Sequence, residues 1–154
     1  MNEAMAKALG RIPSGCAIVT ARTETARTGM LASWVQQAAF EPPMVCVAIK
    51  RGRPIGSLID ASGHFVLNLL GADPKAMFKH FGKGFGPGKN AFAGLAAENV
   101  VGGVAIPDRV GRLSVRVISK ADAGDHDVYI GEVIEAEASD GEPYVHLRKS
   151  GANY

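Results

Sequence analysis

The sequence predicts a mainly β fold: a mostly antiparallel β-barrel with a few short helices on its outside. About six or seven segments are rich in β-branched and other apolar residues, and turn signals separate them. Strands and helices do not alternate strictly, which disfavours a doubly wound parallel sheet. The length of 154 residues fits a single domain over residues 1–154, large enough to bury a core without disulfides.

The first fifty residues supply three predicted strands and one helix. Residues 2–9 form a short helix, which Asn2 can cap and Gly10 ends. Strands are expected over 14–22 and 29–35, on either side of a polar turn at 23–28. The uninterrupted apolar run at 44–50 predicts a central strand that is covered on both faces.

A helix is expected to follow this central strand. Pro54 suits its first position, apolar residues follow at helical spacing, and Gly63 ends it. Residues 64–70 form the next strand. Another helix begins at Asp73-Pro74, with Asp73 as its cap.

The remainder is predicted to be an ordered loop and further strands. The glycine-rich residues 82–94 form a surface loop that Phe85 and Phe92 anchor. Strict alternation predicts a strand over 112–119, and apolar patterning predicts two more over 126–138 and 143–148.

The composition excludes several classes of function. A formal net charge of +2 with scattered cations argues against nucleic-acid binding. Cys16 and Cys46 lie in apolar runs, which indicates two buried structural thiols in a reducing compartment. No apolar run reaches the length of a membrane span. We therefore expect a soluble cytoplasmic protein.

Familiar catalytic motifs are absent from the sequence. The glycine-rich loop reads Gly88-Lys89-Asn90, which lacks the Ser or Thr of a P-loop. The four histidines are too widely spaced for a local metal site, so no metal is predicted. A triad of Ser33, His126 and Asp125 is rejected because no nucleophile elbow accompanies it.

A cationic turn follows the predicted central strand. Lys50, Arg51 and Arg53 come just before a helix N-terminus, where free N–H groups add to their positive charge. Ser57 would add a hydroxyl if it lies in the first helical turn. This pattern is typical of an anion site, although a solvated basic turn explains it equally well.

The stretch 29–43 is the second candidate ligand site. It starts as a strand and ends in a rigid Pro-Pro turn. Small residues at Ala32 and Ser33 would let a flat ligand approach the backbone. Trp34 could form a wall of that pocket or belong to the core.

This stretch resembles the signature of flavin-reductase-like FMN-binding domains: glycine, then Thr-Ala-Asn-Ser or a variant, Ser/Thr-rich positions and an acidic residue before Pro-Pro. The modules at the C-terminal end of flavodiiron proteins carry similar Met-Leu-Ala-Ser-Trp-Val, Lys-His-Phe and Arg-Lys-Ser-Gly runs. The remaining matches are Val45 to Lys50, Pro54, 62–68, Lys79-His80-Phe81, Phe92-Ala93-Gly94, Gly124-Asp125-His126, Gly131-Glu132-Val133 and 148–154.

The resemblance implies a split β-barrel homodimer that binds FMN near the subunit interface. The backbone from Met30 to Val35 would face the isoalloxazine, the basic turn would lie near the phosphate, and Tyr154 would reach the ring. His126 is the candidate catalytic residue. The candidate cofactor-binding residues are Met30, Leu31, Ala32, Ser33, Trp34, Val35, Gln36, Gln37, Lys50, Arg51, Arg53, Ser57 and Tyr154.

One departure bears on affinity. Family members carry hydroxyls at the positions of Gln36, Gln37 and Ala39 in this chain. A glutamine amide can donate a hydrogen bond, but alanine cannot. Either phosphate recognition would then depend more on the basic turn, or FMN affinity would be low, which suits an enzyme that treats the flavin as a substrate.

The resemblance implies two alternative activities. The first is an NAD(P)H:FMN oxidoreductase, with NAD(P)H as co-substrate and hydride transfer to flavin N5. The second is a non-catalytic FMN electron carrier, similar to flavoredoxin, that serves an electron-transfer partner protein. A pyridoxamine-oxidase-like or haem-binding use of the barrel is a third reading, which an absorption spectrum would separate.

Overall fold

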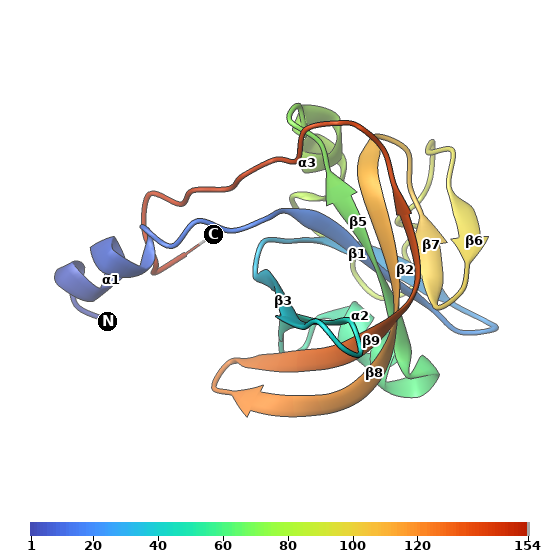
Figure 1. The fold of residues 1–154 in the computed structure, drawn as a ribbon, viewed down its shortest axis with the longest axis horizontal. Helices are drawn as coiled ribbons and strands as arrows, with labels where there is room; N and C mark the ends of the chain where they lie inside the picture. Colours follow the sequence, from blue (N-terminus) through green and yellow to red (C-terminus); the bar gives the residue numbers. More distant parts are fainter. Residues whose placement is uncertain (154) are drawn as a thin grey trace.

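A computed structural model describes residues 1–153 of the chain. Helices and strands follow one another in the order shown in Figure 1. Their bounds are α1 (Glu3–Leu9), β1 (Ala17–Arg22), β2 (Arg27–Ala32), β3 (Val35–Ala39), β4 (Met44–Lys50), α2 (Pro54–Ser62), β5 (His64–Leu70), α3 (Lys75–Phe81), β6 (Glu98–Val100), β7 (Gly103–Ala105), β8 (Arg109–Ala123) and β9 (His126–Ala138).

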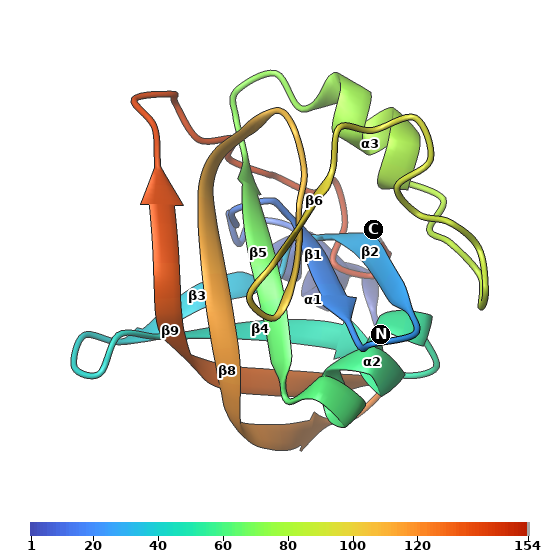
Figure 2. The same cartoon turned by 90° about the vertical axis from the view of Figure 1, so that its right-hand side faces the viewer.

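A seven-stranded antiparallel sheet forms the body of the protein, in the strand order β2-β1-β5-β8-β9-β4-β3. The sheet curls round on itself, as Figure 2 shows. Its end strands β2 and β3 follow each other in the chain but are not paired, so the described residues form a split barrel and not a closed one. The predicted fold class is confirmed.

Two apolar clusters stabilise the body, one on each side of the sheet. The cluster inside the barrel includes Val47, Phe65 and Tyr129, and α2 covers its end with Ile55 and Ile59. The other lies between the sheet, α3 and the glycine-rich loop; its largest members are Ile18, Leu70, Phe81, Phe92 and Ile106. Each fully buried large side chain contributes roughly 1.5–3 kcal/mol, so both clusters matter for stability.

The β8–β9 hairpin brings its tip to the end of β4. Gly124 takes a left-handed conformation at φ 76° and donates its N–H to Asp122 Oδ1, which closes the turn. His126, the first residue of β9, pairs with Ala123 on one side and Lys50 on the other. The fold thus places the predicted catalytic histidine beside the predicted basic turn.

Most predicted elements are confirmed. The bounds of β4, β5 and β9 coincide with the predicted strands 44–50, 64–70 and 126–138. Helix α1 is capped as expected, because Asn2 Oδ1 accepts a hydrogen bond of 2.9 Å from the Met5 N–H. The glycine-rich loop is ordered around a buried Phe92 and a packed Phe85.

Other predictions are wrong. The strand expected at 29–35 is interrupted, because β2 ends at Ala32 and β3 starts at Val35. The strand expected at 143–148 is an extended tail, whose backbone forms the isolated bridges Gly71↔Pro143 and Ser14↔His146 and no continuous ladder among the described residues. The short β6–β7 hairpin was not anticipated, and the cap of α3 is Pro74, without a side-chain hydrogen bond, instead of Asp73.

Strand β4 also differs from its prediction. Val45, Val47 and Ile49 are buried, whereas Met44 and Cys46 on the alternate face are only half-buried. The strand is therefore not covered on both faces within one chain. Cys46 is correspondingly not a buried thiol.

The two ends of the chain form an arm beside the barrel. Figure 1 shows α1 and the tail lying together, away from the sheet. The Gly151 N–H donates to the Ala6 carbonyl at 2.6 Å, which ties them to each other. No residue of α1 is buried, and the arm exposes six large apolar side chains, those of Met1, Met5, Leu9, Ile12, Val145 and Leu147.

Candidate functional site

A cavity of about 290 Å³ opens where the end of β2 meets the end of β4. Five predicted cofactor-binding residues line it: Met30, Leu31, Ser33, Lys50 and Arg53. Residues that sequence reasoning did not assign to a site complete the lining, namely Cys16, Phe81, Gly82, Gly84 and His146. Residues from both candidate sites, the stretch 29–43 and the basic turn at 50–53, therefore line the same cavity.

The bend between β2 and β3 shapes the first wall. Ala32 turns into the barrel core, and the Trp34 carbonyl accepts a hydrogen bond of 3.0 Å from the Ala48 N–H on β4. This bond draws the bend over the neighbouring strand. Gly29 lets α3 pack closely, since a Cβ there would stand 3.3 Å from the Phe81 ring.

The basic turn supplies the second wall, and its cations differ in their surroundings. Arg51 bridges Asp122 at 2.6 Å and Asp127 at 2.9 Å. Its hydrogen bond with Asp122, and secondly that with Asp127, raises the pKa of the Arg51 guanidinium. Arg51 therefore holds the β8–β9 hairpin, and it does not line the cavity.

Lys50 and Arg53 are available for an anion. Within residues 1–153 no salt bridge joins either side chain to an acidic group. The glycine-rich loop lies directly on Arg53, because a Cβ on Gly84 would come within 3.2 Å of its Nη1. Two exposed cations at one cavity have the chemistry to bind a phosphate group.

His126 lies behind this wall. Its side chain is 5% exposed, and its Nδ1 is 2.7 Å from Asp125 Oδ1. A carboxylate can only accept, so Nδ1 carries the proton. This hydrogen bond lowers the pKa of Asp125. The Trp34 ring lies 4.7 Å from the imidazole, and the Arg148 guanidinium lies 5.0 Å from the Trp34 ring.

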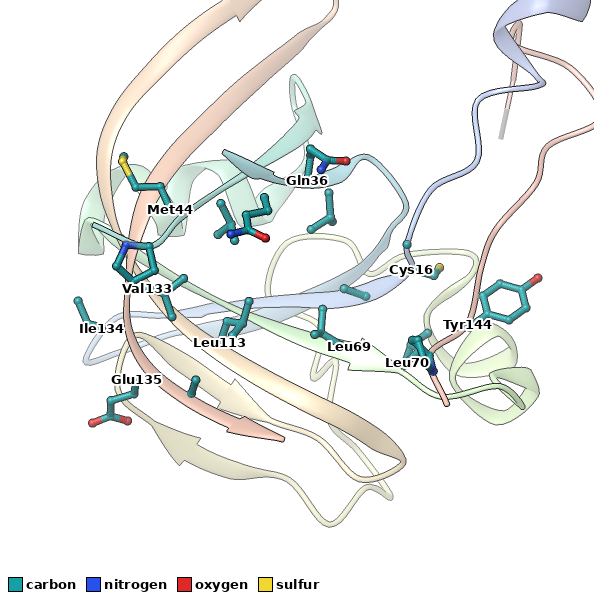
Figure 3. Close-up of a pocket in the computed structure, with 18 residues that line it drawn as sticks. Cys16, Gln36, Met44, Leu69, Leu70, Leu113, Val133, Ile134, Glu135 and Tyr144 are labelled. Carbon is teal, nitrogen blue, oxygen red and sulfur yellow. The ribbon is translucent and has the colours of Figure 1, made fainter. Parts of the chain in front are cut away.

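The larger cavity, of about 710 Å³, has a different chemistry (Figure 3). Its lining holds the predicted residues Val35, Gln36 and Gln37 beside the apolar side chains of Met44, Leu69, Leu113 and Val133. Among residues 1–153, no Lys, Arg or His lines it, and Glu135 contributes a carboxylate. A phosphate is thus better accommodated in the smaller cavity.

The other predicted residues lie elsewhere. Ser57 lines a third cavity, of about 480 Å³, together with Arg27 and Lys89. Tyr154 lies outside the described residues. Cys16 borders both the small and the large cavity, and burial raises the pKa of its thiol to about 11, so it stays protonated at neutral pH.

The described residues contain no group of three or more His, Cys, Asp and Glu side chains that could hold a metal ion. None of the described helices is long and apolar enough to cross a membrane.

The split antiparallel barrel, with a cationic cavity beside a bent edge strand, is the arrangement that the sequence resemblance implies. The chain belongs to the flavin reductase like domain family, whose model matches residues 9–153. This agrees with the resemblance noted in the sequence.

Relatives and solved structures agree with this assignment. Diflavin flavoprotein A 1 of Synechocystis sp. is 36% identical over 158 residues, which cover 100% of this chain and 28% of that protein. The chain thus spans about a quarter of the length of such curated relatives. Among solved structures, the NADH:FAD oxidoreductase SgcE6 of Streptomyces globisporus has a TM-score of 0.84 at 22% identity, covering 93% of this chain and 87% of that one.

A second flavin reductase, PheA2, has a TM-score of 0.81 at 24% identity, with coverage of 96% and 94%. SgcE6 has also been solved in complex with NAD and FAD fragments, and that structure matches with a TM-score of 0.82 at 21% identity over 93% and 86% of the two chains. These likenesses establish the shared fold.

Proposed function

We propose that the protein is an NAD(P)H:FMN oxidoreductase. The observation that carries the proposal is that Lys50 and Arg53, two cations with no salt bridge among residues 1–153, line one cavity with Met30, Leu31 and Ser33. The family assignment supports a flavin as the ligand.

The cavity fits the polar half of a flavin nucleotide. Lys50 and Arg53 would hold the phosphate, and the peptide groups at the bend would face the ring. His146 Nδ1 lies buried without a hydrogen-bond partner among the described residues, as expected where a polar ligand supplies the partner. A bound flavin would accept the hydride at N5 from nicotinamide C4.

His126 would orient the second nucleotide. Asp125 fixes the imidazole through Nδ1, and Trp34 packs against its face, so the ring has little freedom. A buried, oriented histidine beside a cation suits contact with a nicotinamide amide or a proton held near the reacting atoms. Its side chain would position the co-substrate, while the flavin carries the redox chemistry.

We also propose that the protein is a homodimer with FMN near the interface. The arm exposes apolar side chains such as Ile12 and Leu147, at 57% and 64% exposure. The larger apolar cavity is lined in part by Ala17 and Val45 of the cluster inside the barrel, and it borders the base of the arm at Gly15 and Tyr144. Contiguous apolar surface of this kind is typical of a subunit interface. The free thiols of Cys16 and Cys46 support a cytoplasmic location.

A non-catalytic electron carrier is the second candidate. It is favoured by the curated relatives, which are named diflavin flavoproteins and contain the matching region as about a quarter of their length. In such an arrangement a partner protein would reduce the flavin and NAD(P)H would not.

Kinetic and binding measurements separate the two. Purified protein is mixed with FMN or FAD, and NADH or NADPH oxidation is followed by nicotinamide absorbance. If the protein is an oxidoreductase, NADH or NADPH is oxidised only when both the protein and a flavin are present. Tight flavin binding without oxidation by either nucleotide, together with reduction by a ferredoxin or rubredoxin, would establish the carrier instead.

A further inference from the structure

The C-terminal tail presents alternate side chains to the barrel. Tyr144, His146 and Arg148 are half-buried, whereas Val145 and Leu147 between them are exposed. Tyr144 packs edge-on against Phe78 of α3, with ring centroids 5.4 Å apart. Arg148, at the other end, lies over Trp34. The inward face of the tail therefore extends from α3 to Trp34, whose ring lies beside that of His126.

His146 stands in the middle of this face and lines the 290 Å³ cavity together with Lys50 and Arg53. Its backbone is fixed, since it donates to the Ser14 carbonyl at 2.7 Å and accepts from the Ser14 N–H at 3.0 Å. Its ring lies 6.0 Å from that of Tyr144 and 6.3 Å from that of Phe78. The imidazole is thus held at the cavity by its surroundings.

The polar part of this ring is not satisfied by the protein. Nδ1 is shielded from solvent and has no hydrogen-bond partner in the described part of the chain. A buried nitrogen without a partner destabilises a fold, so such an atom requires an explanation. Burial, and secondly the charge of Arg148, lowers the pKa of His146, which keeps the ring neutral at pH 7.

We propose that His146 is a flavin-contacting residue: its imidazole hydrogen-bonds to a polar atom of the nucleotide held in the cavity that it shares with Lys50 and Arg53. The inference rests on the proposed function, because the ligand is the flavin. A neutral ring suits this position, since it recognises carbonyl, ring-nitrogen or hydroxyl groups and leaves the phosphate to the two cations. The tail is then one wall of the flavin site as well as part of the arm.

The test measures FMN affinity of the full chain by fluorescence titration for four variants. His146→Leu removes both ring nitrogens, whereas His146→Asn and His146→Gln restore an amide near the position of Nδ1 or Nε2. Val145→Thr, on the outward face of the same tail, is the matched control. We expect His146→Leu to weaken FMN binding by about tenfold or more, and one amide variant to regain most of the loss.

Thermal unfolding without ligand separates this role from a structural one. Because the protein leaves Nδ1 unsatisfied, His146→Leu should unfold at the same temperature as the wild type or higher, but gain less stability from added FMN. Equal FMN affinity for wild type and His146→Leu would overturn the inference alone. So would equal losses in all three His146 variants, which would mark the ring as a wall fixed by shape. No binding of FMN or FAD by the wild type would overturn the proposed function and this inference together.

Discussion

Replacing Arg53 with alanine tests which member of the basic turn holds the flavin phosphate. Arg53 lines the small cavity and has no salt bridge within the described chain, whereas Arg51, two residues earlier, bridges Asp122 and Asp127. A hydrogen bond to a charged group contributes about 1.5–3 kcal/mol. Arg53 is exposed, and solvent screening favours the lower end of that range. We therefore expect Arg53→Ala to weaken FMN binding about tenfold.

Riboflavin, which lacks the phosphate, provides the ligand control. Fluorescence titrations should show unchanged riboflavin affinity for Arg53→Ala and a tenfold loss for FMN, and added salt should narrow the difference. Arg51→Ala is the protein control: it should reduce thermal stability while FMN retains its preference over riboflavin. If Arg51→Ala abolished that preference and Arg53→Ala preserved it, the assignment of the phosphate site would be refuted.

Three further predictions concern packing, pH and assembly. Gly131→Ala would place a Cβ 2.5 Å from Val115 Cγ1, so it should lower the free energy of unfolding by about 1–3 kcal/mol, whereas Gly86→Ala, with open space around it, should not. Hydrogen bonds from arginine lower the pKa of Glu137 from 4.5 to about 2, so its contribution to stability is complete above pH 4.5 and disappears as the pH falls toward 2; Glu137→Gln should flatten this part of the acid unfolding profile. Leu147→Asp should convert a dimer into monomers in size-exclusion chromatography with light scattering, and an unchanged dimer mass would exclude the arm from the interface.

Local sequence patterns predicted correctly the strands that pair along their whole length with a neighbouring strand. The runs at 44–50 and 64–70 are apolar and end in turn residues, and both pair along their length with long neighbouring strands. The 126–138 segment was likewise found with its exact bounds. In these segments local propensity and tertiary pairing agree.

Tertiary contacts explain the misses. The run around Ser33 and Trp34 has strand-like composition, but the hydrogen bond from Ala48 to the Trp34 carbonyl fixes a bend there. The tail at 143–148 alternates like a strand, yet it meets only single residues, Ser14 and Gly71. A pattern within one segment cannot indicate how many partners that segment will find.

The sequence predicted the general location of the site, but contacts between residues far apart in the sequence decide which side chains line it. The sequence marks three cations in one turn, but the salt bridges that separate Arg51 from Lys50 and Arg53 come from residues about seventy positions later. His146 was missed because its segment was interpreted only as a strand. The sequence did carry a signal for His146: Tyr144, His146 and Arg148 alternate with apolar residues and therefore share one face of an extended segment. Such a face can contribute side chains to a ligand site.

A crystal structure of the protein soaked in FMN tests the central claim most directly. We predict the phosphate within hydrogen-bonding distance of Lys50 and Arg53, with the ring system against the backbone of Met30 to Ser33. A phosphate bound instead in the cavity lined by Ser57 and Lys89, or a ring confined to the large apolar cavity, would contradict the account.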